Sequence, residues 1–170
     1  MPTRRQVIGS GAVALAALAA GGLIYESRGE AAPGDAFAFR VLDGEDRAIL
    51  AAIVPAMIPA ANVMATIEGF DTAVAGLTPS VQAEIAQLFT ILRVPLVRLL
   101  ATGIVTPWSQ ASVADVSAFL TRWRFSPILK LRAAYDALHQ LTLAAWYGSS
   151  AAWPAIGYPG PPLVRPRMSS

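Results

Sequence analysis

Residues 42–59 read LDGEDRAILAAIVPAMIP, and this stretch decides the fold class of the chain. Asp43 is a preferred helix-capping residue, and acidic side chains follow in the first turn, where they interact favourably with the helix dipole. Apolar residues then recur at helical spacing, and these are Ile49, Leu50, Ile53, Val54 and Met57. Proline interrupts helices, so Pro55 and Pro59 should kink or end this one.

The same signals recur along the rest of the chain, and beyond residue 40 there is no convincing alternation typical of strands. A second helix is expected over residues 67–77, and a third begins at Thr78-Pro79, bends at Pro95 and stops at Gly103. Ser112 to Asp115 resemble a capping box for a helix that runs through Trp123. Ser126-Pro127 should start the last long helix, which ends near Gly148. The pattern predicts an all-α, irregular bundle of about five helices.

The chain is apolar for a soluble domain. Of its 170 residues, 55% are hydrophobic and 14% are charged, and the mean hydropathy is +0.50. Part of the excess lies in the N-terminal segment, and the remainder suggests surface that a partner covers. The net charge of +2 is too small to argue for nucleic acid, and no nucleic-acid motif is present. No nucleic-acid partner is therefore expected.

The residue inventory restricts the chemistry of the chain. It has no cysteine, which excludes disulfides, thiolate catalysis, iron–sulfur ligation and covalent haem attachment. A single histidine argues against an ordinary zinc site, which draws on several His and Cys ligands. We therefore expect no cofactor in this chain.

Residues 1–31 look like a targeting segment. Arg4 and Arg5 precede an apolar run from Val7 to Ile24, and paired arginines before such a run resemble the signal for twin-arginine export. The alternative is a retained membrane anchor, because the run is about long enough to span a bilayer. Either interpretation places the body in the periplasm, at the inner membrane, and makes the twin-arginine translocase a partner.

The remainder divides into a linker at residues 32–40, the helical bundle at 41–149 and an extended tail at 150–170. The tail contains WPAIGYPGPP at residues 153–162. Proline restricts the backbone in advance and lowers the entropy lost on docking, while Trp153 and Tyr158 supply aromatic contact area. The tail is expected to dock on a partner, to pack on its own bundle, or both.

No catalytic constellation is specific in this sequence. His139 follows Asp136 on the last helix, but a histidine in a helix is more often a packing residue than a general base. Asp43, Glu45 and Asp46 lack calcium-loop spacing and are better explained by the helix start. Four residues are expected to lie in the core or along a groove, namely Met57, Met64, Trp108 and Trp146.

A basic stretch surrounds Ser126-Pro127 and consists of Arg122, Arg124, Lys130 and Arg132. Such a stretch is usually a solvated face, and the alternative is a docking patch for an acidic partner or headgroup. Trp123 lies between Arg122 and Arg124 and favours docking, because Trp and Arg are enriched at binding hot spots. Arg122, Trp123 and Arg124 are therefore candidate partner contacts.

The arrangement resembles a known family, the gluconate 2-dehydrogenase subunit 3 type, which comprises small subunits of flavin-dependent membrane dehydrogenases. The similar features run from the paired arginines through the first helix, which ends in Met57-Ile58-Pro59. They continue with Phe119-Leu120-x-x-Trp123, Arg132-x-x-Tyr135 and Trp146-Tyr147. The terminal motif is the most specific of them, and it consists of Trp153, Gly157, Tyr158, Pro159, Gly160, Pro161 and Pro162.

This resemblance implies an accessory subunit without catalytic residues. In the family, the small chain escorts a large FAD-dependent dehydrogenase of the glucose–methanol–choline type, which has no export signal of its own. FAD belongs to that large subunit, and a cytochrome c subunit with haem can complete the membrane-associated complex. The resemblance assigns partner binding to Trp153, Gly157, Tyr158, Pro159, Gly160 and Pro161. The alternative from the residues is a stand-alone periplasmic or membrane-tethered helical binding or structural protein, whose pocket would use His139, Arg132 and Tyr135.

Overall fold

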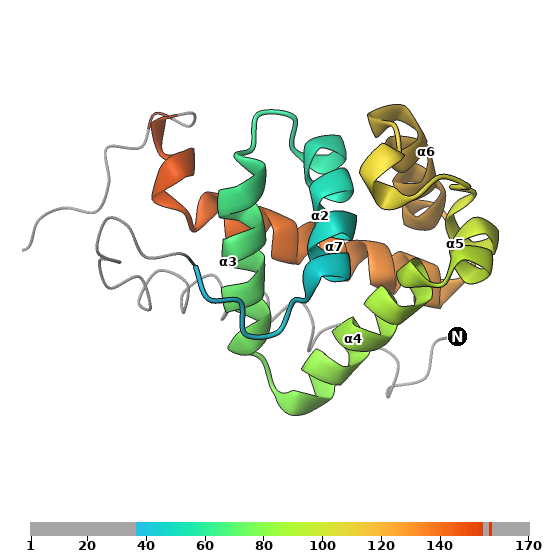
Figure 1. Ribbon diagram of the computed structural model, residues 1–170, viewed down its shortest axis with the longest axis horizontal. Coiled ribbons are helices and arrows are strands. Elements are labelled where there is room, and N and C mark those ends of the chain that lie inside the picture. The colour runs from blue at the N-terminus through green and yellow to red at the C-terminus, as the bar shows by residue number, and fades with distance from the viewer. Residues whose placement is uncertain (1–36, 155–156, 158–170) are drawn as a thin grey trace, which may run out of the picture.

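A computed structural model of the chain describes residues 37–154 and residue 157, and this part is all-α without strands. Figure 1 shows its helices wound into an irregular bundle, as the sequence predicts. The α-helices are α2 (Gly44–Met57), α3 (Val63–Ala75), α4 (Pro79–Arg93), α5 (Pro95–Thr102), α6 (Val113–Arg124) and α7 (Leu129–Tyr147). Two short 3-10 helices, η1 (Trp108–Gln110) and η2 (Ser150–Ala152), complete the described elements.

The start of α2 confirms the predicted cap. The Asp43 carboxylate accepts hydrogen bonds from the backbone N–H groups of Glu45 and Asp46 at 2.9 and 3.0 Å. The Asp46 side chain reaches back to the N–H of Asp43, which completes a capping box. Pro55 lies inside the last turn, and the helix ends at Met57.

Two helix starts differ from the prediction. α3 begins at Val63, because the Asn62 side chain accepts the N–H of Ala65 and caps the helix earlier than the expected start at Ile67. α7 begins at Leu129 with Ile128 at the cap position. Ser126 instead accepts the N–H of Ile128 at 3.1 Å, so its hydroxyl orders the turn before the helix.

The break between α4 and α5 confirms the predicted role of Pro95. Val94 is extended (φ −67°, ψ 117°), as expected for a residue before proline, and the two helix axes differ in direction by 95°. α5 ends at Gly103, whose φ of 74° lies in the left-handed region that only glycine adopts without strain.

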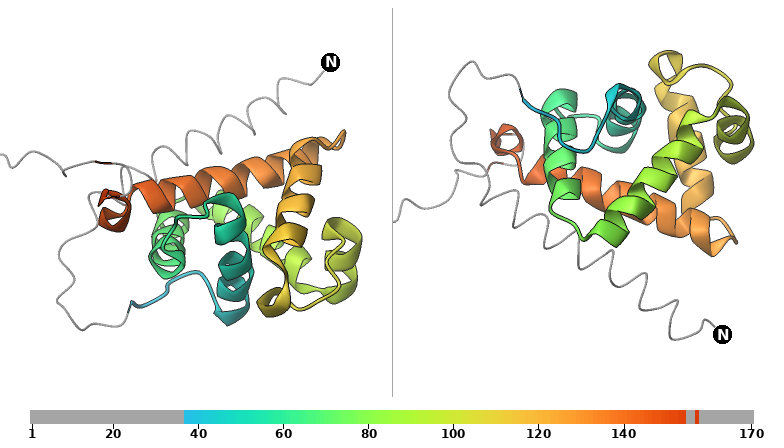
Figure 2. Two further views of the ribbon diagram at one scale, coloured as in Figure 1. Left: turned by 90° about the horizontal axis from the view of Figure 1, so that it is seen from above. Right: turned by 60° about the horizontal axis from the view of Figure 1, so that its bottom comes forward.

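The core lies where α2, α3, α6 and α7 meet. α3 packs against α7 and α2 against α6, and Figures 1 and 2 show α7 crossing the same side of α2 and α3. The largest fully buried side chains are Phe70, Phe89, Phe119, Ile49, Leu50, Ile53, Ile67, Leu92, Leu138, Leu141 and Val54. The apolar spacing of the first helix therefore marks the buried face correctly.

α3 and α7 approach each other closely at Gly69. A Cβ added at Gly69 would lie 2.8 Å from the carbonyl oxygen of Ala145 and 3.2 Å from its Cα. Both atoms belong to the backbone of a packed helix and cannot move aside cheaply. Gly69 thus permits the contact that closes the core.

We expect Gly69→Ala to lower the free energy of unfolding by ~1–3 kcal/mol, the usual cost of overpacking a core. The matched control is Gly44→Ala, because a Cβ at Gly44 meets only the end of the Arg47 side chain at 3.7 Å. Urea denaturation followed by circular dichroism measures both. Equal stabilities of the two variants would contradict the close-contact interpretation.

Candidate functional site

The sequence-predicted site residues fall into two groups. Arg4, Arg5, Tyr158 and Pro159 to Pro161 lie outside the described residues, so the export signal and most of the terminal motif stay predictions. The others, Arg122, Trp123, Arg124, Trp153 and Gly157, have described positions. They do not form one site, because the first three lie on α6 and the last two follow α7.

The first residues of the tail are turned, whereas an extended segment was predicted from residue 150. Ser150–Ala152 form η2, and the Trp153 N–H donates to the Ser150 carbonyl at 3.3 Å. Trp153 is half-buried, and Gly157 adopts a φ of 67°. Apolar contact between η2 and the end of α7 explains the turn, because Ala152 is fully buried and the two elements pack together.

Trp123 lies in the core, with 2% of its surface exposed. Its indole N–H donates to the Ala101 carbonyl at 2.8 Å, and its ring stands edge-on to Phe119. Arg122 donates from Nη2 to the Thr102 carbonyl. Both side chains therefore bind the carboxyl end of α5, and burial gives Trp123 a structural role that needs no partner.

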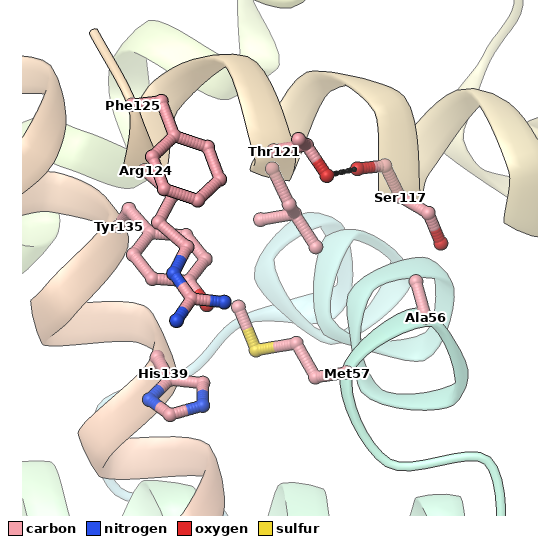
Figure 3. Close-up of a pocket in the computed structure, with 9 residues that line it drawn as sticks. Ala56, Met57, Ser117, Thr121, Arg124, Phe125, Tyr135 and His139 are labelled. Carbon is pink, nitrogen blue, oxygen red and sulfur yellow. Dashed lines mark hydrogen bonds between the residues drawn. The ribbon is translucent and has the colours of Figure 1, made fainter.

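Arg124 is exposed and lines a pocket of about 280 Å³ between α2, α6 and α7 (Figure 3). Its guanidinium lies 5.3 Å from the Phe125 ring centroid and 5.9 Å from that of Tyr135. Tyr135 in turn stacks on His139 at 5.4 Å. The pocket thus combines a cation, a phenol and an imidazole with apolar walls.

The pair of Asp136 and His139 suggested by the sequence does not form in the described part of the chain. Asp136 is exposed, and Tyr135 is the neighbour that contacts the imidazole. Met57 lines the pocket as predicted. Trp108 and Trp146 are buried as expected, whereas Met64 is 57% exposed, so its assignment to the core or a groove is wrong.

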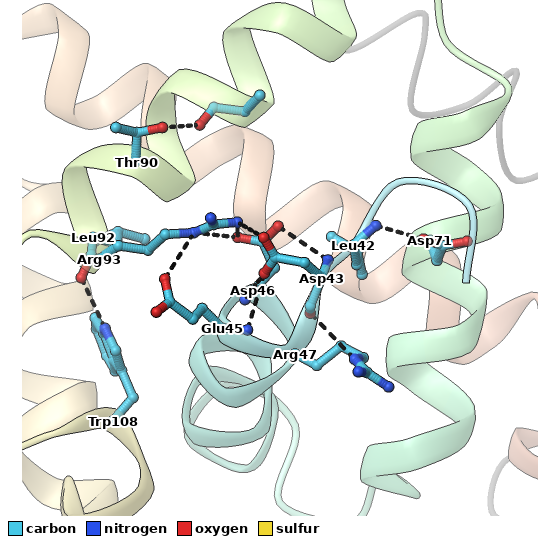
Figure 4. A network of polar contacts seen from close by, with 11 residues as sticks. Leu42, Asp43, Glu45, Asp46, Arg47, Asp71, Thr90, Leu92, Arg93 and Trp108 are labelled. Carbon is cyan, nitrogen blue, oxygen red and sulfur yellow. Dashed lines mark hydrogen bonds and ion pairs between the residues drawn. The ribbon is translucent and has the colours of Figure 1, made fainter. Parts of the chain in front are cut away.

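The acidic residues at the start of α2 bind Arg93 at the end of α4 (Figure 4). Its Nη2 lies 2.8 Å from Asp43 Oδ2 and 2.5 Å from Asp46 Oδ1, and its Nε lies 3.8 Å from Glu45 Oε2. These carboxylates therefore hold a guanidinium. Within residues 37–154 and 157, no group of three His, Asp or Glu side chains is arranged to hold a metal ion.

The pKa values of Asp43 and Arg93 are shifted. The hydrogen bond from the Asp46 N–H lowers the pKa of Asp43 below its ordinary 3.8. Burial raises this pKa by less than that bond lowers it, and the Arg93 charge lowers it further. Hydrogen bonding to Asp46 raises the pKa of Arg93. Each charged form is thus stabilised by the folded state.

Asp71 on α3 is a residue that sequence reasoning missed. It is fully buried, and its carboxylate accepts the backbone N–H groups of Arg40, Val41 and Leu42 at 3.0, 2.9 and 2.8 Å. It therefore fastens the segment before α2 onto α3. The available signal was an acidic residue, three positions after Glu68, in an otherwise apolar helical stretch.

Two further pockets lie on α4. One, of about 450 Å³, is an apolar groove between α4 and α7 that includes Ile91 and Lys130. The other, of about 220 Å³, includes the buried Arg98 beside Arg93. Of the described helices, none alone has the length and apolarity to cross a bilayer, and only the bent pair α4–α5 meets those criteria together.

Comparison with protein-family models, curated proteins and solved structures finds no match for this chain. The family resemblance carried by the terminal motif therefore stays a prediction.

We expect Asp71→Asn to lower the free energy of unfolding by ~1–3 kcal/mol, because the new amide group cannot accept all three N–H groups. Asp115→Asn is the control, since Asp115 is exposed and bonds only locally to Ser112. Urea denaturation measures both variants. A loss no larger for Asp71→Asn than for the control would show that the carboxylate does not hold the segment.

The lowered pKa of Asp43 predicts a specific pH dependence. A group with a depressed folded-state pKa contributes stability above its ordinary pKa, here 3.8, and this contribution is lost as the pH falls through the folded value. The stability difference between wild type and Asp43→Asn should therefore be constant above about pH 5 and shrink below pH 4. Thermal unfolding across this pH range measures it, and a difference that grows on acidification would refute the assignment.

Proposed function

We propose that this chain is a non-catalytic small subunit that escorts, exports and stabilises a large FAD-dependent dehydrogenase of the glucose–methanol–choline type. The complex is periplasmic and associated with the inner membrane, and a cytochrome c subunit is a further partner. In this proposal, FAD belongs to the large subunit, and the twin-arginine signal at Arg4 and Arg5 carries the assembled pair through the translocase.

The observation that carries the proposal is the placement of aromatic side chains where the terminal motif leaves the bundle. Trp146 is buried with 4% exposure and anchors the end of α7, while its neighbour Tyr147 is 49% exposed. Trp153 follows after η2 and is half-buried. Partly exposed aromatic residues beside a Pro/Gly-rich segment supply contact area at low entropic cost, as interface anchors do.

The remaining polar groups support an accessory role because they hold the bundle together. Asp43 and Asp46 bind Arg93, Asp71 binds backbone N–H groups, and Trp123 donates to a carbonyl of α5. The conspicuous acidic and aromatic residues thus already have structural functions. In the described part of the chain, this leaves the polar pocket of Figure 3 as the alternative centre of function.

That pocket favours a second candidate function, a stand-alone helical protein that binds a small molecule. Arg124 and His139 offer cationic or donor groups, and Tyr135 and Phe125 offer ring faces. This combination suits a small carboxylate with an apolar body. Loss of such binding in His139→Ala, with the fold intact by circular dichroism, would support this second candidate.

An affinity pull-down of the full chain from mildly solubilised membranes tests the first proposal. We expect a large chain with flavin absorbance to be retained. Trp153→Ala and Tyr158→Ala should each weaken its retention about thirtyfold, the effect of truncating an interface hot spot. Phe125→Ala is the matched control, because Phe125 is equally aromatic and 72% exposed but belongs to the turn between α6 and α7.

A parallel arm separates export from assembly. Arg4→Lys with Arg5→Lys should leave the large subunit in the cytoplasm while the two chains still co-purify. Because a C-terminal tag adjoins the proposed docking segment, the pull-down is repeated with an untagged C-terminus and an antibody. A pure chain without flavin under both conditions would overturn the proposal, and so would a large subunit that reaches the periplasm despite the double substitution.

A further inference from the structure

α5 turns its apolar residues outward and its polar residues inward, the reverse of the usual arrangement in a globular domain. Leu96 and Leu100 are 67% and 79% exposed, whereas Arg98 and Thr102 are 8% and 1% exposed. Residues four apart share a helix face, so the two leucines form one face and the two polar residues the opposite one.

Hydrogen bonds fix this orientation of α5. Arg98 Nη2 donates to the Val105 carbonyl at 3.2 Å, and the Thr102 hydroxyl donates to the Arg98 carbonyl at 2.8 Å while accepting the Ile104 N–H at 3.2 Å. Trp123 and Arg122 bind carbonyls at the end of the same helix. Rotating α5 to bury its leucines would break the bonds that Arg98, Arg122 and Trp123 make between the helix and its surroundings, so the exposed face is built into the fold.

The exposed apolar side chains concentrate around this helix. Of the fifteen large hydrophobic residues that are exposed in the described part of the chain, ten lie between residues 94 and 129. They are Val94, Leu96, Val97, Leu99, Leu100, Val105, Val113, Phe125, Ile128 and Leu129. Figures 1 and 2 place α5 and the α6–α7 turn at one end of the molecule, opposite η2. We call this end, formed by residues 94–105 and 122–132, the α5 end.

The charge of the α5 end is one-sided. Residues 94–135 contain five basic side chains, Arg98, Arg122, Arg124, Lys130 and Arg132, and a single acidic one, Asp115. The ion pairs found in the described part of the chain all belong to Arg93, so no carboxylate neutralises these five cations.

Three of the cations lie at or next to the apolar side chains. Arg122 binds the carboxyl end of α5, Arg124 lies 5.3 Å from the exposed Phe125 ring, and Lys130 directly follows the exposed Leu129 at the start of α7. The α5 end therefore pairs an apolar face with a positive rim.

We propose that the α5 end binds the surface of an anionic lipid bilayer, with α5 lying in the interface plane. Aliphatic side chains with adjacent Lys and Arg are the composition of interfacial membrane helices, whose cations bind anionic headgroups. The cores of protein interfaces are enriched in Trp, Tyr, Phe and Met, whereas the exposed face of α5 itself consists of leucine and valine. This inference does not require the flavoprotein partner.

The absence of cysteine from the chain allows a local test with the full-length protein. Leu100→Cys, labelled with an environment-sensitive fluorophore, is mixed with vesicles of equimolar phosphatidylglycerol and phosphatidylcholine. We expect a blue-shifted, several-fold brighter emission that lipid-borne quenchers reduce. Because the label reports only its own surroundings, the signal is independent of an N-terminal segment that also enters the bilayer. Val105→Cys, 74% exposed, provides a second label position.

Met64→Cys is the control position, because Met64 is 57% exposed at the start of α3. Its label should stay in water when vesicles are added. Arg124→Gln and Lys130→Gln should each reduce the vesicle affinity reported at Leu100→Cys about fivefold. High salt should lower it as well.

Three outcomes would overturn the proposal. The labels at residues 100 and 105 could remain in water with anionic vesicles, or respond equally to neutral vesicles in both wild-type and charge-substituted backgrounds. They could also change only when the flavoprotein subunit is added, which would make the α5 end a protein interface. The pull-down of the tail variants is a separate experiment, so failure of the membrane-binding proposal and failure of the escort function are distinguishable.

Discussion

The ion pair of Arg93 with Asp43 and Asp46 is the contact on which the arrangement of the helices depends. Asp46 is 6% exposed, so removal of its partner would leave a carboxylate largely withdrawn from water, which is costly. Arg93 is the last residue of α4, directly before the break at Val94 and Pro95. Trp108 strengthens the same junction through its bond to the Leu92 carbonyl at 2.9 Å. The start of α2 and the end of α4 are thereby joined, and α5 begins after the break at Pro95 beside this junction.

Buried polar groups then decide which face of α5 meets water. In most helices apolar burial sets the rotation about the axis, but here the bonds of Arg98, Arg122 and Trp123 to and from the end of α5 set it. A buried guanidinium is costly unless its donors are satisfied, and Arg98 Nε has no protein acceptor. The arrangement leaves this donor unpaired and exposes leucines, so apolar burial does not account for it. The outward apolar face is therefore better explained by a binding function than by folding.

Local signals in the sequence predicted the helices well, because caps, prolines and apolar spacing act within a few residues. The capping box at Asp43, the break at Pro95 and the end at Gly103 are confirmed. The cap at Asn62 was missed because the apolar spacing that begins at Ile67 was used as the signal for the start of this helix. The contacts of Asp71 and Arg93 join residues about 30 and 47 positions apart. No periodicity encodes such pairs, so their structural roles, and the burial of Trp123, emerge only from the packed helices.

The positions of the two candidate surfaces constrain how the molecule could work. α7 has 19 residues and thus a length of about 28 Å, with the tail at its end and the α6–α7 turn at its start. A partner bound at the tail and a bilayer bound at the α5 end would contact opposite ends of this helix and would not compete. Such a subunit would hold a large enzyme at a set distance above the membrane, where electrons can pass to a membrane acceptor. Neither surface requires a catalytic residue in this chain, since the chain would contribute only by positioning the enzyme relative to the membrane.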